Sequence, residues 1–382
     1  MIAIVGASVA GALLAHRLAS AERQVLLFEH QPDWEKPCGG GCTFKIFSHL
    51  PEMQALPIER NPVRIVELEM DGRSARLTLQ QPVFIYSRSQ LDRGLLDLAV
   101  SSGARLIPER VTAIERRGST WHIQTTGGIY QAEGLVGADG ARSLVRRRLA
   151  QPFETADLSM ALGYYVPGAK HLDTMLIQFF RDNFDGYVWS FPRTDHLSVG
   201  IIHSLAGRES SELRRRVSAY IAERYGNEAL AASQYFGALV PALRTATLDA
   251  QRCSGPDWLL VGDAAGFVDP ITGEGIHYAL RSAELAAESI LQDRWAAFDW
   301  RWRDDFGAEL RSSAHYKDRF YLQSTLGRHN LDWMLALTRR SACVRDIQGD
   351  FIAGRSGYAA TRGKLVRSAP KILAESLLKL AG

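Results

Sequence analysis

The chain has few cysteines, little net charge and no long apolar run, and each of these shortages excludes a class of protein. Four cysteines among 382 residues are too few for a fold held together by disulfides. A formal net charge of +3 gives no reason to expect a nucleic-acid partner. No apolar run approaches the roughly 18 residues that a membrane-spanning helix needs.

The remaining composition is ordinary. Hydrophobic residues make up 46% and charged residues 23%, as in a typical folded domain, and the sequence shows no repeat or low-complexity segment. The length of 382 residues suffices for two domains or for one domain with a large insertion. An apolar strand pattern starts directly after Met1, so we expect no secretion signal. We therefore expect a globular protein of the cytoplasm.

A glycine-rich stretch with a single carboxylate stands out in the second half of the chain. Residues 262–266 read Gly-Asp-Ala-Ala-Gly and follow an apolar, strand-like run. A helical pattern begins near Ile276, after the turn residues Pro270, Gly273 and Gly275. This arrangement offers an acceptor for sugar hydroxyls and N–H donors at the positive end of a helix dipole. It suits a phosphate-bearing, polyhydroxylated ligand, although an ordinary glycine-rich turn can have the same pattern.

The N-terminus has the pattern of a strand–helix–strand unit that binds a dinucleotide. Two apolar runs enclose a helical pattern, and the residues that mark such a unit are Gly6, Ser8, Gly11 and Glu29. Gly6 would form the tight turn, Gly11 would allow close packing of helix on strand, and Glu29 would accept from a ribose hydroxyl. Ser8 replaces the middle glycine of the fingerprint, but its N–H and hydroxyl can still donate to a phosphate.

The same turn has a second, hydrolytic interpretation. Residues 6–10 resemble a nucleophile elbow, in which Ser8 would attack the substrate. An elbow does not predict Glu29, and no Asp/His pair follows in a recognisable context. We therefore favour the dinucleotide unit.

A third turn of the same kind lies between these two. An apolar run ends in Asp139 and Gly140, and Arg146 follows in the next helical pattern. By itself an Asp-Gly pair is a common turn. Its place between two other strand–turn–helix motifs makes it informative.

Together, the three turns resemble the FAD-binding motifs of the flavoprotein hydroxylase superfamily, in the same order. The resemblance covers residues 1–292 and implies FAD, with its adenosine end at the N-terminal turn, its ribityl chain on Asp263 and its flavin ring at 270–275. An arginine at the position of Arg88 approaches the cofactor in that superfamily, although a solvent-facing arginine is equally common at the start of a helix. The implied cofactor-binding residues are Gly6, Ser8, Gly11, Glu29, Arg88, Asp139, Gly262, Asp263, Pro270, Gly273 and Gly275.

Within that superfamily, three segments resemble the geranylgeranyl reductase family. They are 37–41 (Pro-Cys-Gly-Gly-Gly), 187–192 (Tyr-Val-Trp-Ser-Phe-Pro) and 262–275. The family's second motif ends in a glycine where this chain has Ile202. Because that motif lines the substrate channel in the family, the resemblance does not identify the substrate. The resemblance implies that Cys38 is a catalytic residue beside the flavin. It also implies a substrate channel lined by Tyr187, Trp189, Phe191 and Gly200.

The resemblance implies an FAD-dependent oxidoreductase that reduces carbon–carbon double bonds of an isoprenoid or another hydrophobic substrate. The alternatives are an FAD monooxygenase or halogenase acting on an aromatic or polyketide-like substrate, and a non-catalytic flavin carrier. A halogenase would have a Trp-x-Trp-x-Ile-Pro segment, whose first tryptophan is Tyr187 here. No second dinucleotide fingerprint is present, so NAD(P)H would dock transiently or another donor would supply electrons.

The positions of the motifs predict an α/β fold with a discontinuous, Rossmann-like FAD-binding domain, an antiparallel β-sheet substrate domain and a helical C-terminal region. Alternating residues around Asp71-Gly72 indicate a hairpin, as do two further runs between 111 and 125. Helical spacing appears in 90–102 and 209–225. The predicted FAD-binding domain is 1–60, 86–155 and 251–292, the substrate domain is 61–85 and 156–250, and the C-terminal region is 293–382.

The cysteines and the basic clusters are the remaining candidates for further sites. Cys38 and Cys42 flank three glycines, so a reversible disulfide is conceivable, but two reduced thiols are the simpler expectation. Two cysteines without neighbouring ligands do not complete a zinc site, and we expect no metal. The clusters 146–148 and 214–216 are expected on solvated helix faces, with phosphate binding as the alternative.

The last helical pattern, 364–380, has an apolar face. Leu365, Ala369, Ile372, Leu373, Leu377 and Leu380 share that face, while Arg367, Lys371 and Lys379 lie elsewhere. A core-capping helix is the simpler interpretation. The alternative is peripheral contact with the inner face of the membrane.

Overall fold

A five-stranded parallel sheet forms the centre of the first half of the molecule in the computed structural model, which describes residues 1–168 and 173–378. Apolar runs form these strands because both faces of the sheet are covered, and β1 and β2 are buried at every position. In spatial order the strands are β16 (Trp258–Leu260), β10 (Gly134–Gly137), β1 (Ile2–Val5), β2 (Val25–Phe28) and β6 (Arg105–Ile107).

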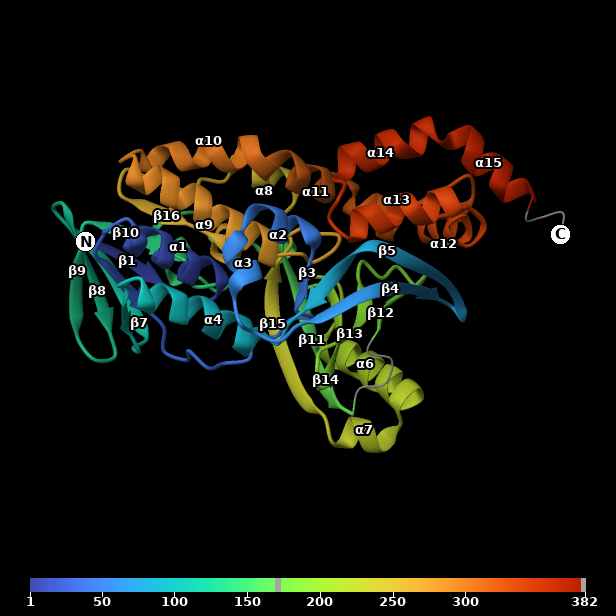
Figure 1. The fold of residues 1–382 in the computed structure, drawn as a ribbon, viewed down its shortest axis with the longest axis horizontal. Coiled ribbons are helices and arrows are strands. Elements are labelled where there is room, and N and C mark those ends of the chain that lie inside the picture. Colours follow the sequence, from blue (N-terminus) through green and yellow to red (C-terminus); the bar gives the residue numbers. More distant parts are fainter. Residues whose placement is uncertain (169–172, 379–382) are drawn as a thin grey trace.

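Three helices pack together against this sheet, and a small antiparallel sheet contacts two of its strands. Helix α1 packs against both α4 and α9, and strands of the small sheet contact β1 and β10 (Figure 1). These three helices are α1 (Val9–Ser20), α4 (Arg88–Ser101) and α9 (Ile276–Leu291), and the short helix α5 (Leu144–Leu149) contacts β10 and the small sheet. The small antiparallel sheet consists of β7 (Val111–Arg117), β8 (Thr120–Thr125) and β9 (Ile129–Ala132).

The second large sheet has eight strands and curls below the C-terminal helices (Figure 1). All neighbouring strands are antiparallel except β12 and β4, which are parallel. The spatial order is β15 (Gln234–Pro241), β11 (Leu158–Pro167), β14 (His196–Ser204), β13 (Tyr187–Pro192), β12 (Thr174–Phe179), β4 (Asn61–Met70), β5 (Arg73–Ile85) and β3 (Gly41–Cys42). The predicted α/β fold with a mostly antiparallel second sheet is confirmed.

Shorter helices connect these sheets. Helix α6 packs on strands β11 and β14 through its apolar face, which includes Leu213, Val217 and Ile221. The connecting helices are α2 (Phe44–His49), α3 (Pro51–Ala55), α6 (Ser210–Tyr225), α7 (Asn227–Ala231) and α8 (Thr245–Ala250).

The C-terminal region is helical, with one short hairpin that the sequence did not indicate, β17 (Ser324–Thr325) with β18 (Arg328–His329). No helix in residues 1–168 and 173–378 combines the length and the hydropathy required to cross a membrane. The helices are α10 (Phe298–Trp302), α11 (Ala308–Tyr321), α12 (Asn330–Arg340), α13 (Ala342–Ile352), α14 (Tyr358–Arg367) and α15 (Ala369–Leu378).

The prediction of one continuous helix over 364–380 is wrong. The chain forms α14 and α15, separated at Ser368. Pro370 lacks an N–H and its ring would clash in a helix interior, but it is tolerated in the first turn of a new helix. Lys379 and Leu380, which were part of the predicted helix, lie outside the described residues.

Candidate functional site

The three glycine turns lie side by side because they follow the adjacent strands β1, β10 and β16. The Ala138 N–H donates to the Val5 carbonyl at 2.8 Å, and the Val261 N–H donates to the Gly137 carbonyl at 2.9 Å. Carboxyl ends of neighbouring parallel strands form the binding edge of such sheets. The sequence motifs therefore converge at one edge, as expected.

The first turn depends on two glycines. Gly6 has a φ of +97°, and a Cβ atom there would lie 2.4 Å from the Ala138 carbonyl oxygen. A Cβ at Gly11 would lie only 1.9 Å from the Gly6 carbonyl oxygen, so helix and strand touch at this point. The Glu29 carboxylate accepts from the Ala7 N–H at 3.1 Å, which places the acidic side chain beside the turn.

Ser8 and Arg88 form a compact polar cluster with Asp92. The Arg88 guanidinium donates to Ser8 Oγ at 2.9 Å and to both Asp92 oxygens, and Ser8 Oγ donates to Asp92 Oδ2 at 3.0 Å. Burial opposes the charge of Arg88, but Asp92 and the neighbouring Cys38 raise the pKa of its guanidinium. Among described residues, the hydrogen-bond partners of the Ser8 hydroxyl are a carboxylate and a guanidinium and include no imidazole. The structure therefore gives the nucleophile-elbow interpretation no support.

Asp139 stabilises the start of helix α5. Its carboxylate accepts from the Ser143 hydroxyl, from the Leu144 N–H at 2.6 Å and from the Val145 N–H at 3.3 Å. Burial raises the pKa of Asp139. The Asp139 carboxylate thus shapes the second turn.

Arg146 contradicts the expectation of a solvated basic cluster. Its side chain is 2% exposed, stacks 3.8 Å from the Phe153 ring centre and donates to the Ala264 carbonyl at 3.2 Å. The sequence could not show this because burial of a helical arginine depends on a partner 118 residues away. Arg147 and Arg148 are exposed, as expected. Arg146 therefore fixes the second turn to the third.

Asp263 lies between the first turn and helix α9. The N–H of Gly262, which has a φ of +57°, donates to Ser282 at 3.0 Å, and a Cβ at Gly275 would lie 3.5 Å from Asp263 Oδ1. The Asp263 carboxylate accepts from Lys36 Nζ at 2.9 Å. Lys36 was missed by the sequence analysis. Its position directly before the Pro-Cys-Gly-Gly-Gly segment could have indicated that Lys36 lies near the site.

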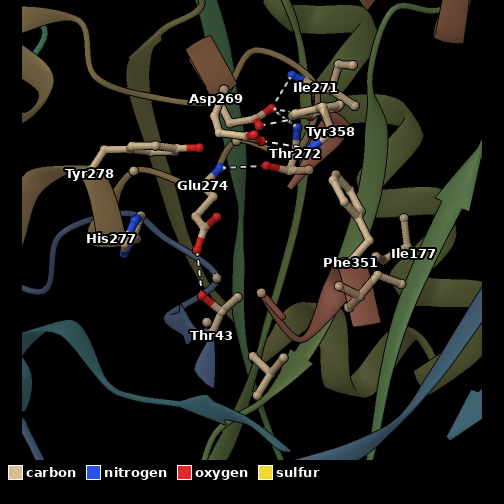
Figure 2. A pocket seen from close by; sticks show the side chains of 18 of the residues that line it. Thr43, Ile177, Asp269, Ile271, Thr272, Glu274, His277, Tyr278, Phe351 and Tyr358 are labelled. Atoms are coloured by element: carbon tan, nitrogen blue, oxygen red, sulfur yellow. Dashed lines mark hydrogen bonds between the residues drawn. The ribbon is translucent and has the colours of Figure 1, made fainter. Parts of the chain in front are cut away.

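The segment 269–275 is held by hydrogen bonds from several elements (Figure 2). Asp269 is 3% exposed, and its Oδ1 accepts from the Ile271 N–H at 2.8 Å and the Thr272 N–H at 2.9 Å. Its carboxylate also accepts from Ser313 of α11 and from Tyr358 of α14, the latter at 2.9 Å. Burial raises the pKa of Asp269. Two C-terminal helices therefore help to set the loop that is expected to face the flavin ring.

The same loop is also fastened through its carbonyls and through Glu274. Tyr321 donates to the Ile271 carbonyl at 2.6 Å, and Tyr187 donates to the Thr272 carbonyl. On the other side Glu274 accepts from Lys45 at 2.6 Å. It also accepts from Thr43 at 2.8 Å, as Figure 2 shows. The loop is therefore fixed between the second sheet, the C-terminal helices and the segment after Cys38.

A cavity of about 1340 Å³ opens from this loop and from the segment 37–41. One wall comes from the second sheet and the opposite wall from the C-terminal helices, whose part in the cavity the sequence analysis missed. Their amphipathic spacing was visible, but which apolar face would meet the sheet was not. The sheet contributes Leu68, Met175, Ile177, Phe179, Tyr187, Trp189, Phe191 and Ile202, and the helices contribute Phe320, Tyr321, Met334, Phe351, Ile352 and Tyr358.

The predicted aromatic residues line this cavity. Tyr187, Trp189 and Phe191 belong to its wall, and Phe191 lies against Gly39, where a Cβ would be 2.6 Å from the ring. Gly200 is not part of the wall, but a Cβ there would lie 2.2 Å from the Trp189 ring. Gly200 thus makes room for the indole. Ile202 also lines the cavity, and its Cδ1 atom would lie 3.7 Å from a Cβ at Gly273.

Cys38 lies on the cavity wall in a well-defined loop. Its carbonyl accepts from Arg193 and from Ser198, each at 2.9 Å, and its sulfur accepts from the Gly40 N–H at 3.3 Å. All four cysteines are free thiols. Cys42 is fully buried and does not line the cavity, and burial raises the pKa of its thiol.

These features fit FAD. The two glycines let the first turn and helix α1 pack closely, as a dinucleotide-binding unit requires, the Glu29 and Asp263 carboxylates lie beside the first and third turns, and the α9 N-terminus adjoins the cavity. Among described residues, no group of three or more His, Cys, Asp or Glu side chains is placed to hold a metal ion.

Comparisons with known proteins agree with this geometry. Residues 1–291 match the FAD binding domain family. The chain is 30% identical over 360 residues to digeranylgeranylglycerophospholipid reductase 2 of Methanothermobacter thermautotrophicus, covering 87% of this chain and 90% of that protein. It is 27% identical over 321 residues to menaquinone reductase of Mycobacterium tuberculosis, covering 78% of each.

A solved structure shows the same fold. The geranylgeranyl bacteriochlorophyll reductase-like protein of Thermoplasma acidophilum matches with a TM-score of 0.76 at 19% identity, over 96% of this chain and 98% of that one. The fold, the converging turns and the relatives together identify the chain as an FAD-dependent oxidoreductase of the geranylgeranyl reductase family.

Proposed function

We propose that this protein reduces carbon–carbon double bonds of an isoprenoid or another hydrophobic substrate. The observation that carries the proposal is the cavity of about 1340 Å³, whose two apolar walls lead away from Cys38 and the 269–275 loop. Binding pockets for drug-sized ligands are usually about 300–1,000 Å³. A cavity above this range, with two apolar walls, leaves room for a long apolar chain beside a flavin ring at the 269–275 loop.

The cofactor, when bound, would supply hydride-transfer chemistry, and the protein would supply position and exclusion of water. We propose that Gly6, Ser8, Gly11, Glu29, Arg88, Asp139, Gly262, Asp263, Pro270, Gly273 and Gly275 form its site. In this arrangement Arg88 and Asp139 act by ordering the first two turns, because their polar atoms already bond to the protein. NAD(P)H or another carrier would deliver electrons.

An anaerobic assay tests the proposed reaction. Protein reduced with dithionite should be reoxidised when a polyprenyl substrate is added without oxygen, because the substrate then accepts the electrons. The return of the yellow absorbance and the saturated product by mass spectrometry are the measurements. Turnover that requires oxygen and adds oxygen or halide to the substrate would contradict the reductase and favour the monooxygenase or halogenase.

Replacing Cys38 by serine should slow turnover by about tenfold or more while FAD stays bound. The physical reason is that a thiol beside the reacting atoms can supply a proton, and positioned proton donors contribute at least that much. Single-turnover kinetics and the flavin content of the purified variant are the measurements. The matched control is Cys343→Ser, which changes a thiol outside the cavity lining. Equal turnover rates for both variants would show that Cys38 has no catalytic role.

We also propose that helices α14 and α15 contact a membrane surface. Leu365, Val366, Leu373 and Leu377 are exposed there, near the cations Arg362, Arg367 and Lys371. Leu365 and Arg362 line the cavity as well, so the exposed apolar residues adjoin the cavity. An apolar substrate could then enter without crossing water.

Vesicle co-sedimentation tests this contact. Leu373→Glu should reduce binding to vesicles that contain anionic lipid, because it places a charge in the interface. The matched control is Ile129→Glu, a charge placed at an equally exposed apolar residue of β9. If both variants sediment like the unmodified protein, α15 does not contact the membrane.

A further inference from the structure

A second, smaller cavity is surrounded by arginines. It has a volume of about 360 Å³ and lies between the start of β5, the strand β18 and the end of α12. Its lining contains four guanidinium groups and one carboxylate: Arg73, Arg328, Arg339, Arg340 and Asp332. We call this group the arginine pocket. It is separate from the large cavity, with which it shares no lining residue.

The carboxylate of the arginine pocket does not balance its cations. Asp332 Oδ1 accepts from Arg181, which is not part of the lining, and Arg73 Nη1 lies 4.0 Å from the same oxygen. In residues 1–168 and 173–378, no ion pair involves Arg328 or Arg340. Arg328 and Arg340 therefore bring to this small volume two positive charges that no acidic side chain of the described residues pairs with.

Contacts fix the Arg328 side chain, and helix α12 places Arg339 and Arg340 at the same pocket. Arg328 stacks 4.9 Å from the Trp333 ring centre and donates to the Asp332 carbonyl at 3.4 Å. Arg339 and Arg340 lie in the last turn of α12, where the helix dipole favours cations. Like charges brought together in this way repel, and an anion between them would relieve the repulsion.

We propose that the arginine pocket binds a phosphate group. Guanidinium groups form paired, charge-assisted hydrogen bonds to phosphate oxygens, and several of them around one volume match a phosphate better than a single carboxylate. The volume is large enough for a phosphate ester or diester. This proposal is independent of the redox reaction.

The location indicates where such a phosphate could come from. Helix α12 contacts α15, and the Cys343 N–H after α12 donates to Glu375 of α15 at 3.1 Å. Helices α12 and α15 lie at the same end of the molecule (Figure 1). The phosphate could belong to a lipid headgroup at that surface or to a soluble phosphate ester.

Calorimetric titration with inorganic pyrophosphate at low salt tests the pocket itself. The unmodified protein should bind, and Arg340→Ala should raise the Kd about tenfold, because one charged hydrogen-bonding group is lost. Arg340→Lys should lie between them, since it keeps the charge but not the paired donors. The matched control is Arg215→Ala, an exposed arginine on α6. Absence of binding, or equal affinity of Arg340→Ala and Arg215→Ala, would overturn the proposal.

Vesicle binding separates the two sources. If the phosphate is a lipid headgroup, Arg340→Ala should weaken binding to phosphatidylglycerol vesicles relative to Arg215→Ala. If the variants bind these vesicles equally but differ in pyrophosphate affinity, the pocket takes a soluble phosphate ester. Circular dichroism and unchanged flavin content establish that Arg340→Ala is folded. A failure of either arm leaves the double-bond reduction assay unaffected, so the two proposals fail separately.

Discussion

Asp263→Ala protein should be purified nearly colourless. Asp263 supplies the carboxylate expected to hold the ribityl hydroxyls, and a hydrogen bond to a charged group contributes roughly 1.5–3 kcal/mol. Its loss also leaves the Lys36 ammonium without the partner that it has at 2.9 Å. We expect the Kd for FAD to rise roughly 10- to 100-fold, measured by quenching of flavin fluorescence during titration.

A surface carboxylate provides the control for this variant. Asp249 pairs with Arg311 at 3.0 Å, and both side chains are at least half exposed, so Asp249→Ala should keep FAD. The proposed role of Asp263 would be wrong if Asp263→Ala protein retained its full yellow colour. A Lys36→Met variant separates the two effects, because it removes the ion pair with Asp263 and keeps the carboxylate.

Gly11→Ala should destabilise the protein by about 3 kcal/mol and abolish FAD binding. The added methyl group would meet the Gly6 carbonyl oxygen at 1.9 Å, and backbone cannot move aside as a flexible side chain can. The first turn would have to open, and it is the turn that is expected to approach the pyrophosphate. Thermal or urea unfolding measures the loss of stability, and fluorescence titration measures the loss of affinity.

Gly128→Ala is the matched control, because a Cβ there meets no atom within 4 Å and Gly128 has no unusual φ. The free energy of unfolding of the Gly128→Ala protein should change by less than about 0.5 kcal/mol. If Gly11→Ala were as stable as Gly128→Ala, the close contact of helix α1 with the first turn would not exist in solution.

The parallel sheet and its three glycine turns could be predicted from the sequence because the signals for them are local. Gly6 and Gly262 mark turns by their positive φ, Gly11 marks a close contact of helix α1, and apolar runs mark the buried parallel strands. Each motif is short, and the strand and helix that it connects are adjacent to it in the sequence. The assignment of individual site residues and the domain limits remain predictions.

The remainder could not be predicted because it depends on contacts between distant segments. Arg146 and Asp269 have polar side chains in ordinary sequence contexts, and each is buried by partners from other elements. The cavity wall from the C-terminal helices requires knowledge of how these helices meet the second sheet. The break at Ser368 was foreseeable from Pro370, and the apolar periodicity across it concealed that signal.

The buried carboxylate of Asp269 has a consequence for protein engineering. Because it accepts hydrogen bonds from Ser313 and Tyr358, the C-terminal helices and the 269–275 loop form one structural unit. A chimera that exchanged these helices for those of a relative, in order to change substrate preference, would need hydroxyl donors at both positions. Without them the buried Asp269 carboxylate would lose both hydroxyl donors and keep only the N–H groups of its own loop, and the transplanted helices would disturb the loop that they were meant to support.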